Sequence, residues 1–221
     1  MTGERIVETH DGIQDEFTVE IYDQFLKRMR DKGWMETDQI IKAGINQGLA
    51  LEIGPGPGYL GLEWLKKTEG TRLTGLEISS NMIEVAEKNA REYNLGARVN
   101  YIEGDAQKMP LDDNLFDSVF ANGSLHEWSN PKKIFNEIYR VLKPGRLYFI
   151  SDLRRDTNLF IKWFMKIVTK PKELRPGLVT SFNAAYVVDE VKSILKDTNL
   201  KNYKVSKDTM GLAITGKRIY C

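Results

Sequence analysis

The stretch Leu51-Glu52-Ile53-Gly54-Pro55-Gly56-Pro57-Gly58 decides the fold of this chain. A short apolar run ends in a turn with three alternating glycines, and a helical pattern begins directly after it at Tyr59. Glycine lets the backbone turn sharply and lets a ligand approach the main chain, because no Cβ is in the way. The following helix offers unpaired N–H groups and the positive end of its dipole. The stretch is typical of a strand, a ligand-binding turn and a helix.

Predicted strands and helices continue to alternate around this turn, which indicates a parallel sheet covered by helices on both faces. The predicted strands lie near Leu49–Ile53, Arg72–Glu77, Arg98–Glu103, Phe116–Ala121 and Arg146–Ser151. The predicted helices cover residues 15–31, Met35–Ala43, Leu60–Lys67, Asn81–Tyr93, Pro131–Leu142 and Asn183–Lys196. Two final strands, near Tyr203–Ser206 and Leu212–Lys217, are too close together for a crossover helix and must run antiparallel. We predict an α/β fold with seven strands, mostly parallel, the last one antiparallel.

The composition of the chain restricts its partners and its location. The 221 residues suffice for one sizeable domain. A net charge of +1 implies no field for a polyanion, so we expect no nucleic-acid partner. The single cysteine, Cys221, allows no disulfide within the chain, and no apolar segment of signal or transmembrane character is present. We expect a cytoplasmic protein.

One segment, residues 154–176, interrupts the alternation with seven basic and two acidic residues. Its apolar positions, such as Phe160 and Phe164, alternate with Lys162 and Lys166 at helical spacing. The pattern predicts an amphipathic insertion after the fifth strand. Two interpretations stay open: a cap helix with a solvated charged face, or contact with an anionic, amphiphilic acceptor or a membrane surface.

Four motifs, in this order, resemble those of the class I S-adenosylmethionine-dependent methyltransferases. They are the glycine loop at Gly54–Gly58, Glu77 at a strand end, Gly104-Asp105-Ala106, and Phe116–Asn122 together with Glu137–Gly145. The likeness is well marked over Leu49–Ser151, extends through the reversed last strand, and is greatest to the small-molecule group that includes the ubiquinone and menaquinone C-methyltransferases. It implies a Rossmann-like fold, S-adenosylmethionine as the cofactor and S-adenosylhomocysteine as the product.

The resemblance also implies a division of the chain. We expect a single methyltransferase domain over 1–221, with a helical N-terminal lid at 1–45 and a cofactor-binding core at 46–152. A cap insertion at 153–182 and a C-terminal helix with antiparallel strands at 183–221 complete it. In the family a lid tyrosine often touches the cofactor, and Tyr22 is the best match; ordinary packing is the alternative for this side chain.

The expected cofactor-binding residues gather at the carboxyl ends of the predicted strands, where open α/β sheets bind ligands. A carboxylate at Glu77 can accept hydrogen bonds from both ribose hydroxyls, and one at Asp105 from an adenine amine. Ile78 and Met82 are candidates to flank the adenine, although a helical methionine is more often core, and Asn122 is a candidate for the methionine moiety. The full set is Tyr22, Glu52, Gly54, Pro55, Gly56, Gly58, Glu77, Ile78, Met82, Gly104, Asp105, Ala106 and Asn122.

The expected acceptor is a small molecule. The two-proline pattern of enzymes that methylate base or glutamine nitrogens is absent after Asn122, and so is the cysteine that cytosine C5 chemistry needs nearby. His126 follows the same strand end, and imidazole titrates near neutrality, so it is a candidate general base or substrate-orienting group. A structural histidine is the equal alternative, and we expect no metal.

Two other functions compete with this interpretation. Gly56 to Gly61 formally fits the G-x-G-x-x-G fingerprint of an NAD(P)-binding Rossmann oxidoreductase. It begins two residues late relative to the strand end, and hydride transfer gives no role to Glu52 or Asp105. A non-catalytic S-adenosylmethionine-binding regulator would share the fold and the cofactor site.

Overall fold

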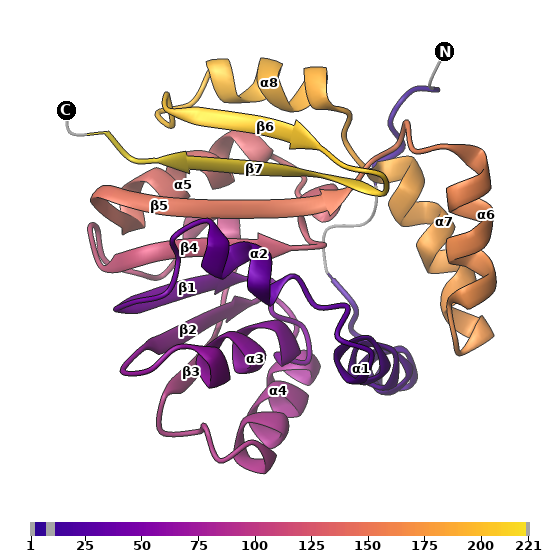
Figure 1. Cartoon of the computed structure of the whole chain (residues 1–221), viewed down its shortest axis with the longest axis horizontal. Helices are drawn as coiled ribbons and strands as arrows, with labels where there is room; N and C mark the ends of the chain where they lie inside the picture. The colour runs from indigo at the N-terminus through magenta and orange to yellow at the C-terminus, as the bar shows by residue number, and fades with distance from the viewer. Residues whose placement is uncertain (1–2, 8–11, 220–221) are drawn as a thin grey trace.

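A computed structural model describes residues 3–7 and 12–219 and contains one seven-stranded sheet with helices on both faces (Figure 1). The strands are β1 (Leu49–Ile53), β2 (Arg72–Glu77), β3 (Val99–Glu103), β4 (Phe116–Asn122), β5 (Leu142–Leu153), β6 (Tyr203–Lys207) and β7 (Gly211–Lys217). Their order across the sheet is β3-β2-β1-β4-β5-β7-β6, and β7 runs antiparallel to both of its neighbours. The predicted fold class, with a reversed last strand, is confirmed.

The helices form two layers and a projecting cap. They are α1 (Glu16–Asp31), α2 (Thr37–Lys42), α3 (Tyr59–Lys67), α4 (Ser80–Glu92), α5 (Pro131–Val141), α6 (Leu159–Val168), α7 (Arg175–Ala184) and α8 (Val188–Lys196). Short 3-10 turns are η1 (Ala106–Lys108), η2 (Leu125–Glu127) and η3 (Lys172–Leu174). Helices α2, α3 and α4 pack on one sheet face and α5 and α8 on the other, while α6 and α7 stand off the edge toward which β4 and β5 point (Figure 1).

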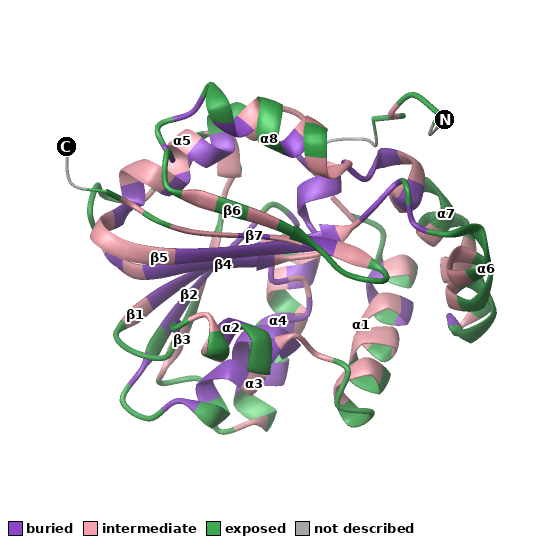
Figure 2. Ribbon diagram, turned by 45° about the horizontal axis from the view of Figure 1, so that its top comes forward, coloured by how far each residue is buried: buried purple, intermediate pink, exposed green. Residues whose placement is uncertain are grey.

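The core follows from the two-residue period of the strands, because successive side chains enter opposite faces. In β1, Ala50 packs under α3 whereas Leu51 packs under α5, and both are fully buried. Trp64 of α3 is also fully buried and donates its indole N–H to the carbonyl of Ile45 at 2.8 Å. Figure 2 shows the resulting buried centre of the sheet between largely exposed outer helix surfaces.

Two elements differ from the sequence prediction. The helix expected over Asn183–Lys196 is divided, because the backbone is extended at Ala185 and Val187, between α7 and α8. Strand β5 begins at Leu142, before the predicted start, and residues 143–146 loop out between two points of its register with β4. The loop is held by Asp117, whose Oδ1 lies 3.0 Å from the Lys143 ammonium.

Two buried arginines after β5 form bonds within the fold. Arg155 is 8% exposed, donates to the carbonyls of Gly3 and Ala185, and forms an ion pair with Glu190. Arg154 pairs with Asp156 at 2.6 Å. These two cations, part of the basic insertion in the sequence, are therefore structural and not displayed. Among the described helices, none is both long and apolar enough to cross a membrane.

Gly61 gives a testable measure of how closely α3 approaches the sheet. A Cβ at this position would lie 2.2 Å from Glu52 Oε2 and 2.3 Å from Leu73 Cδ2, both of them buried side chains. We expect Gly61→Ala to lower the free energy of unfolding by about 1–3 kcal/mol, as overpacking does, despite the better helix propensity of alanine.

Gly177 of α7 supplies the matched control, because nothing lies within 4 Å of its would-be Cβ. We expect Gly177→Ala to be neutral or stabilising by up to about 1 kcal/mol in the same urea titration. Equal effects of the two substitutions would show that α3 does not need the missing side chain.

Candidate active site at the carboxyl edge of the sheet

The glycine loop is built on a backbone that side chains would strain. Gly54, Gly56 and Gly58 have φ angles of 65°, 51° and 82°, in the left-handed region that L-residues rarely adopt. Gly58 donates its N–H to the carbonyl of Pro55 at 2.9 Å, which closes the turn, and α3 starts one residue later. The loop therefore exposes main chain where a bulkier residue would present a side chain.

Glu77 lies against this loop, because β1 and β2 are parallel neighbours whose carboxyl ends share one edge. Its Oε2 accepts the Gly56 N–H at 3.0 Å, and its Oε1 accepts those of Ile78 at 2.9 Å and Ser79 at 3.1 Å. Burial raises the pKa of the Glu77 carboxyl, against the opposing effect of these donors. A carboxylate has about four acceptor sites, so Oε2 keeps capacity for a ligand hydroxyl.

Glu52 is placed differently from Glu77. It is 2% exposed and faces Gly61 of α3, so it lies on the side of the loop turned toward that helix. Its Oε2 has no hydrogen-bond partner among the described residues. Burial, reinforced by the Glu77 charge, raises the pKa of Glu52 to about 8. A direct contact of Glu52 with a cofactor stays a prediction.

The third strand brings Asp105 to the same edge. Gly104 donates its N–H to the carbonyl of Glu77 at 2.9 Å, which ties the ends of β2 and β3 together. The exposed Asp105 caps η1, which starts at Ala106, by accepting the Gln107 N–H at 2.7 Å. The predicted neighbourhood of the glycine loop, Glu77 and Asp105 is thus present.

The two candidates for the adenine faces differ in exposure. Ile78 directly follows the end of β2, is 37% exposed and offers an apolar surface there. Met82 is 3% exposed and belongs to the buried stripe of α4. The burial of Met82 agrees with its core alternative, Ile78 is available to a ligand, and a contact of either residue with adenine stays a prediction.

Helix α1 packs against the glycine loop. Asn89 of α4 joins the two by donating to Asp23 of α1 at 3.0 Å and to the carbonyl of Pro57 at 2.9 Å. The ring of Tyr22 lies over Gly56, with Cε1 3.5 Å from the position that a Cβ there would take. Burial, with the charges of nearby carboxylates, raises the pKa of Tyr22. Tyr22 thus lies against the glycine loop, and its contact with a cofactor remains a prediction.

Two described parts of the N-terminal segment, residues 3–7 and 12–14, are bonded at opposite ends of the edge. Near α4, Ser79 donates its hydroxyl to the carbonyl of Ile13 at 2.7 Å, and Asn81 donates to that of Gln14 at 2.6 Å. At the cap end, Arg5 donates to the carbonyl of His126 at 2.8 Å and stacks over the Tyr186 ring. Residues 3–7 and 12–14 therefore line opposite ends of the same site.

The ends of β4 and β5 carry a polar group that sequence analysis missed. Asn122 donates to the Ser151 hydroxyl at 3.0 Å, and the Glu36 carboxyl faces both. Glu36 Oε2 is buried without a hydrogen-bond partner among the described residues, and burial raises the pKa of this carboxyl. Glu36 precedes α2 in a stretch with no motif, so only the fold reveals it. A Cβ on Gly123 would meet nothing within 4 Å, so this strand end is open.

His126 is buried and oriented by a carboxylate. Its Nδ1 lies 2.9 Å from Asp152 Oδ2 and 3.0 Å from Oδ1, and Asp152 also accepts the His126 backbone N–H at 2.7 Å. An Nδ1–H that donates to Asp152 leaves Nε2 as the ring's acceptor. Nε2 lies 3.9 Å from Glu127 Oε1. This arrangement suits both alternatives for His126, proton transfer and the fixing of η2 to β5.

The residues present fit an adenosyl sulfonium cofactor. At Gly56 a Cβ would meet only the Tyr22 ring within 4 Å, so its main chain is accessible to a ligand, and Glu77 keeps acceptor capacity beside it. Gly123 opens the neighbouring strand end, where one buried oxygen of the Glu36 carboxyl has no hydrogen-bond partner among the described residues. Hydroxyl acceptors, exposed main chain and carboxylates are what a nucleoside with a cationic tail requires.

Glu52 makes stability depend on pH in a defined direction. Its carboxyl stays protonated in the folded protein up to about pH 8, but its ordinary pKa is 4.5. Unfolding therefore releases a proton between these values, and stability falls as the pH rises through that window. We expect Glu52→Gln to flatten the decline between about pH 5 and 8 by roughly 2–4 kcal/mol, at about 1.4 kcal/mol per pKa unit.

Urea unfolding at several pH values measures this effect. Glu69→Gln, at an exposed loop position, is the control and should keep the slope of the parent protein. If Glu52→Gln and the parent gave parallel curves, the Glu52 carboxyl would not be held neutral by its surroundings.

Comparisons with known proteins agree with this geometry. A profile of the methyltransferase domain family matches residues 51–150, which include the glycine loop, Glu77, Asp105 and Asn122. The chain is 34% identical over 112 residues to a sterol 24-C-methyltransferase of Saccharomyces cerevisiae, covering 50% of this chain but only 29% of that enzyme. It is 23% identical over 177 residues to a ubiquinone/menaquinone biosynthesis C-methyltransferase of Ruegeria, covering 74% of this chain and 70% of that one.

A crystal structure extends the agreement to the whole chain. A Methanococcus maripaludis protein described as an S-adenosylmethionine-dependent methyltransferase superposes with a TM-score of 0.76 at 25% identity, covering 98% of this chain and 99% of that one. These matches favour S-adenosylmethionine over a nicotinamide cofactor for the G-x-G-x-x-G segment. Residues 51–150 match the methyltransferase domain family, and the chain as a whole resembles class I S-adenosylmethionine-dependent methyltransferases, among them one named for ubiquinone/menaquinone biosynthesis.

Proposed function

We propose that this protein transfers the methyl group of S-adenosylmethionine to a small apolar or amphiphilic acceptor bound between the sheet edge and the cap. One observation carries the proposal: the Glu77 carboxylate lies 3.0 Å from the Gly56 amide, at the edge that also holds Asn122 and the His126–Asp152 pair. The names of two relatives, a sterol and a quinone methyltransferase, support an acceptor of this class.

Within this proposal, the cofactor supplies a methyl group on a positively charged sulfur, which leaves as a neutral thioether. The Gly54–Gly58 main chain and Glu77 hold the nucleoside, and Asp105 with Ile78 holds its base. Asn122 and Glu36 bind the amino-acid tail or a polar group of the acceptor. In-line displacement mainly needs alignment and the exclusion of water, for which Tyr22 and the cap are placed.

His126 has the role of a positioned base in this proposal. With Nδ1–H bound to Asp152, Nε2 can accept a proton from an acceptor atom that must be deprotonated before or during methylation. The Asp152 carboxylate stabilises the imidazolium that forms, and it fixes the ring in the required tautomer. An acceptor that carries no proton at the reacting atom would leave His126 with an orienting role.

An anionic or amphiphilic acceptor belongs to the same proposal, and so does membrane contact through residues 154–176. The support is three exposed lysines of this segment, Lys166, Lys170 and Lys172, and the exposed apolar side chains of α6. The cytoplasmic location stays a prediction of the sequence.

Calorimetry and label transfer test the proposed function together. We expect micromolar or tighter binding of S-adenosylhomocysteine, and transfer of a radiolabelled methyl group into the organic phase of a cell extract. Binding without transfer to any acceptor would favour the non-catalytic regulator. Label confined to nucleic acid or protein would contradict a small-molecule acceptor.

Glu77→Gln probes the nucleoside end of the site. Loss of a charge-assisted acceptor for a ribose hydroxyl should raise the Kd for S-adenosylhomocysteine by roughly 10- to 100-fold. Glu103→Gln, on the neighbouring strand in register with Glu77, is the control and should bind normally.

The 2′-deoxy analogue of S-adenosylhomocysteine separates ribose recognition from damage to the loop. The parent protein should bind the analogue more weakly than the natural compound, and Glu77→Gln should bind the two alike. A variant that still discriminates between them would place the ribose contact elsewhere.

His126→Ala and Asp152→Asn probe the acceptor end. If His126 accepts a proton, both variants should lower kcat about 100-fold or more while the Kd for S-adenosylhomocysteine changes little. The acidic limb of the kcat profile should also disappear in His126→Ala. Unchanged kcat in a folded His126→Ala protein would assign the histidine to structure alone.

A further inference from the structure

Helix α6 exposes the apolar side chains that a cap helix would be expected to bury. No residue of α6 is buried, and its large hydrophobic side chains are unusually accessible (Figure 2). Their exposed fractions are 80% for Leu159, 68% for Phe160, 57% for Trp163, 51% for Phe164, 45% for Ile167 and 38% for Val168. Six such side chains on one 10-residue helix form a continuous patch, not the scattered exposure that is normal for a surface.

The helical period shows that this exposure is one coherent face. Leu159, Trp163 and Ile167 form one row at four-residue spacing, and Phe160, Phe164 and Val168 form the adjacent row. The opposite side, with Ile161 and Met165, is the half-buried side. The face defined by the two exposed rows is called the apolar face of α6 below.

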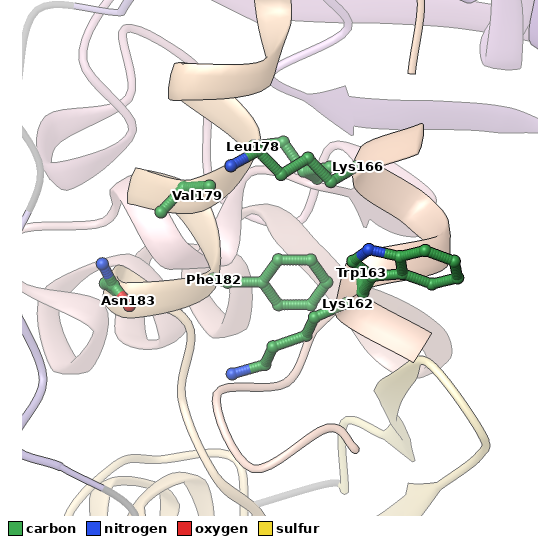
Figure 3. A pocket seen from close by; sticks show the side chains of 7 residues that line it. All are labelled: Lys162, Trp163, Lys166, Leu178, Val179, Phe182 and Asn183. Atoms are coloured by element: carbon green, nitrogen blue, oxygen red, sulfur yellow. The ribbon is translucent and has the colours of Figure 1, made fainter. Parts of the chain in front are cut away.

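The groove between α6 and α7 is lined by lysine side chains, which a cap helix would ordinarily turn toward solvent. It measures about 240 Å³, and Lys162 and Lys166 line it beside Phe182 (Figure 3). The Lys162 ammonium lies 5.2 Å from the Phe182 ring and donates to the carbonyl of Arg155 at 2.6 Å. Lysine stems and the edge of Trp163 thus cover the inner side of α6, whereas the rings of Phe160 and Phe164 do not line the groove and are exposed.

Basic residues border the apolar face. Lys166, Lys170 and Lys172 are exposed, and none of them forms an ion pair with a described residue. Arg154 and Arg155, by contrast, are buried and paired within the fold. The displayed charge next to the apolar face is therefore a cluster of three lysines, with Glu173 as the nearby exposed acid.

We propose that α6 docks this protein on an anionic lipid bilayer, with the apolar face in the boundary between headgroups and acyl chains. An amphipathic helix with aromatic residues on one side and lysines at its border is the arrangement that binds this boundary. The proposal extends the proposed function, because α7 joins the docked helix to η2 and His126, so an apolar acceptor would enter directly from the lipid.

A second copy of the chain is a poorer occupant of the apolar face. Two-fold pairing through α6 would bring the same surface of both copies together and place their lysine clusters near each other. Like charges in such proximity oppose association, whereas anionic headgroups neutralise them. The charge pattern therefore selects the lipid surface.

Co-sedimentation with vesicles tests the docking without cofactor or acceptor. We expect the full chain to bind phosphatidylcholine vesicles with about 30% phosphatidylglycerol at least tenfold better than pure phosphatidylcholine. Phe160→Gln with Phe164→Gln should weaken this binding at least tenfold. Lys166→Gln and Lys170→Gln should each weaken it about fivefold, more at low salt than at high salt.

Phe17→Gln on α1 is the matched control, because Phe17 is also an aromatic residue and is 61% exposed. It should leave vesicle binding unchanged. Binding of S-adenosylhomocysteine is measured for each variant as well, because it reports an intact fold and cofactor site. A variant that binds this compound but not vesicles has lost docking alone, so a failure of docking is distinct from a failure of the proposed function.

Brominated lipids give an independent reading of orientation. They should quench the fluorescence of Trp163, measured as the difference between the parent and Trp163→Phe. Three outcomes would overturn the proposal: no binding to either vesicle, binding that survives Phe160→Gln with Phe164→Gln, or no quenching of Trp163. A dimer that the same double variant dissociates, without vesicle binding, would assign the apolar face to a second copy.

Discussion

The contact between the Glu77 carboxylate and the Gly56 amide organises the site. It joins the ends of two parallel strands, and it can form because the loop at Gly56 adopts a left-handed conformation that turns the N–H toward β2. The same carboxylate caps the turn at Ile78 and Ser79. The acid therefore both builds the loop and remains in position to bind a ligand, and these two roles impose the same geometry on the edge.

Burial determines how the neighbouring acids behave. Glu52 and Glu77 approach the same loop, yet Glu52 faces α3 and its pKa is raised to about 8, so it is largely neutral at physiological pH. Glu36 repeats this pattern at the end of β4, where burial also raises its pKa. Burial that favours the neutral form of these acids limits the repulsion between neighbouring carboxyl groups. A cationic ligand bound nearby would favour their ionised form.

Local patterns predicted the parts of the structure that depend on neighbouring residues in the chain. The glycine loop, Glu77 and the β-strand ends follow from strand–turn–helix order, and the helices that cover the sheet follow from hydrophobic period. Glu36 was not predictable, because tertiary packing alone brings it to Asn122. The spacing in α6 showed two faces but could not show which one the protein covers, and the burial of Arg155 depends on Glu190, in a different helix.

The N-terminal segment has a consequence for the catalytic cycle. It is bonded near α4 through Ile13 and Gln14, and near the cap through Arg5. Segments held at the surface by a few polar bonds open at small free-energy cost. Residues 12–14 lie on the nucleoside side and Arg5 on the acceptor side, so breaking these few hydrogen bonds would open either end of the site while the sheet stays intact.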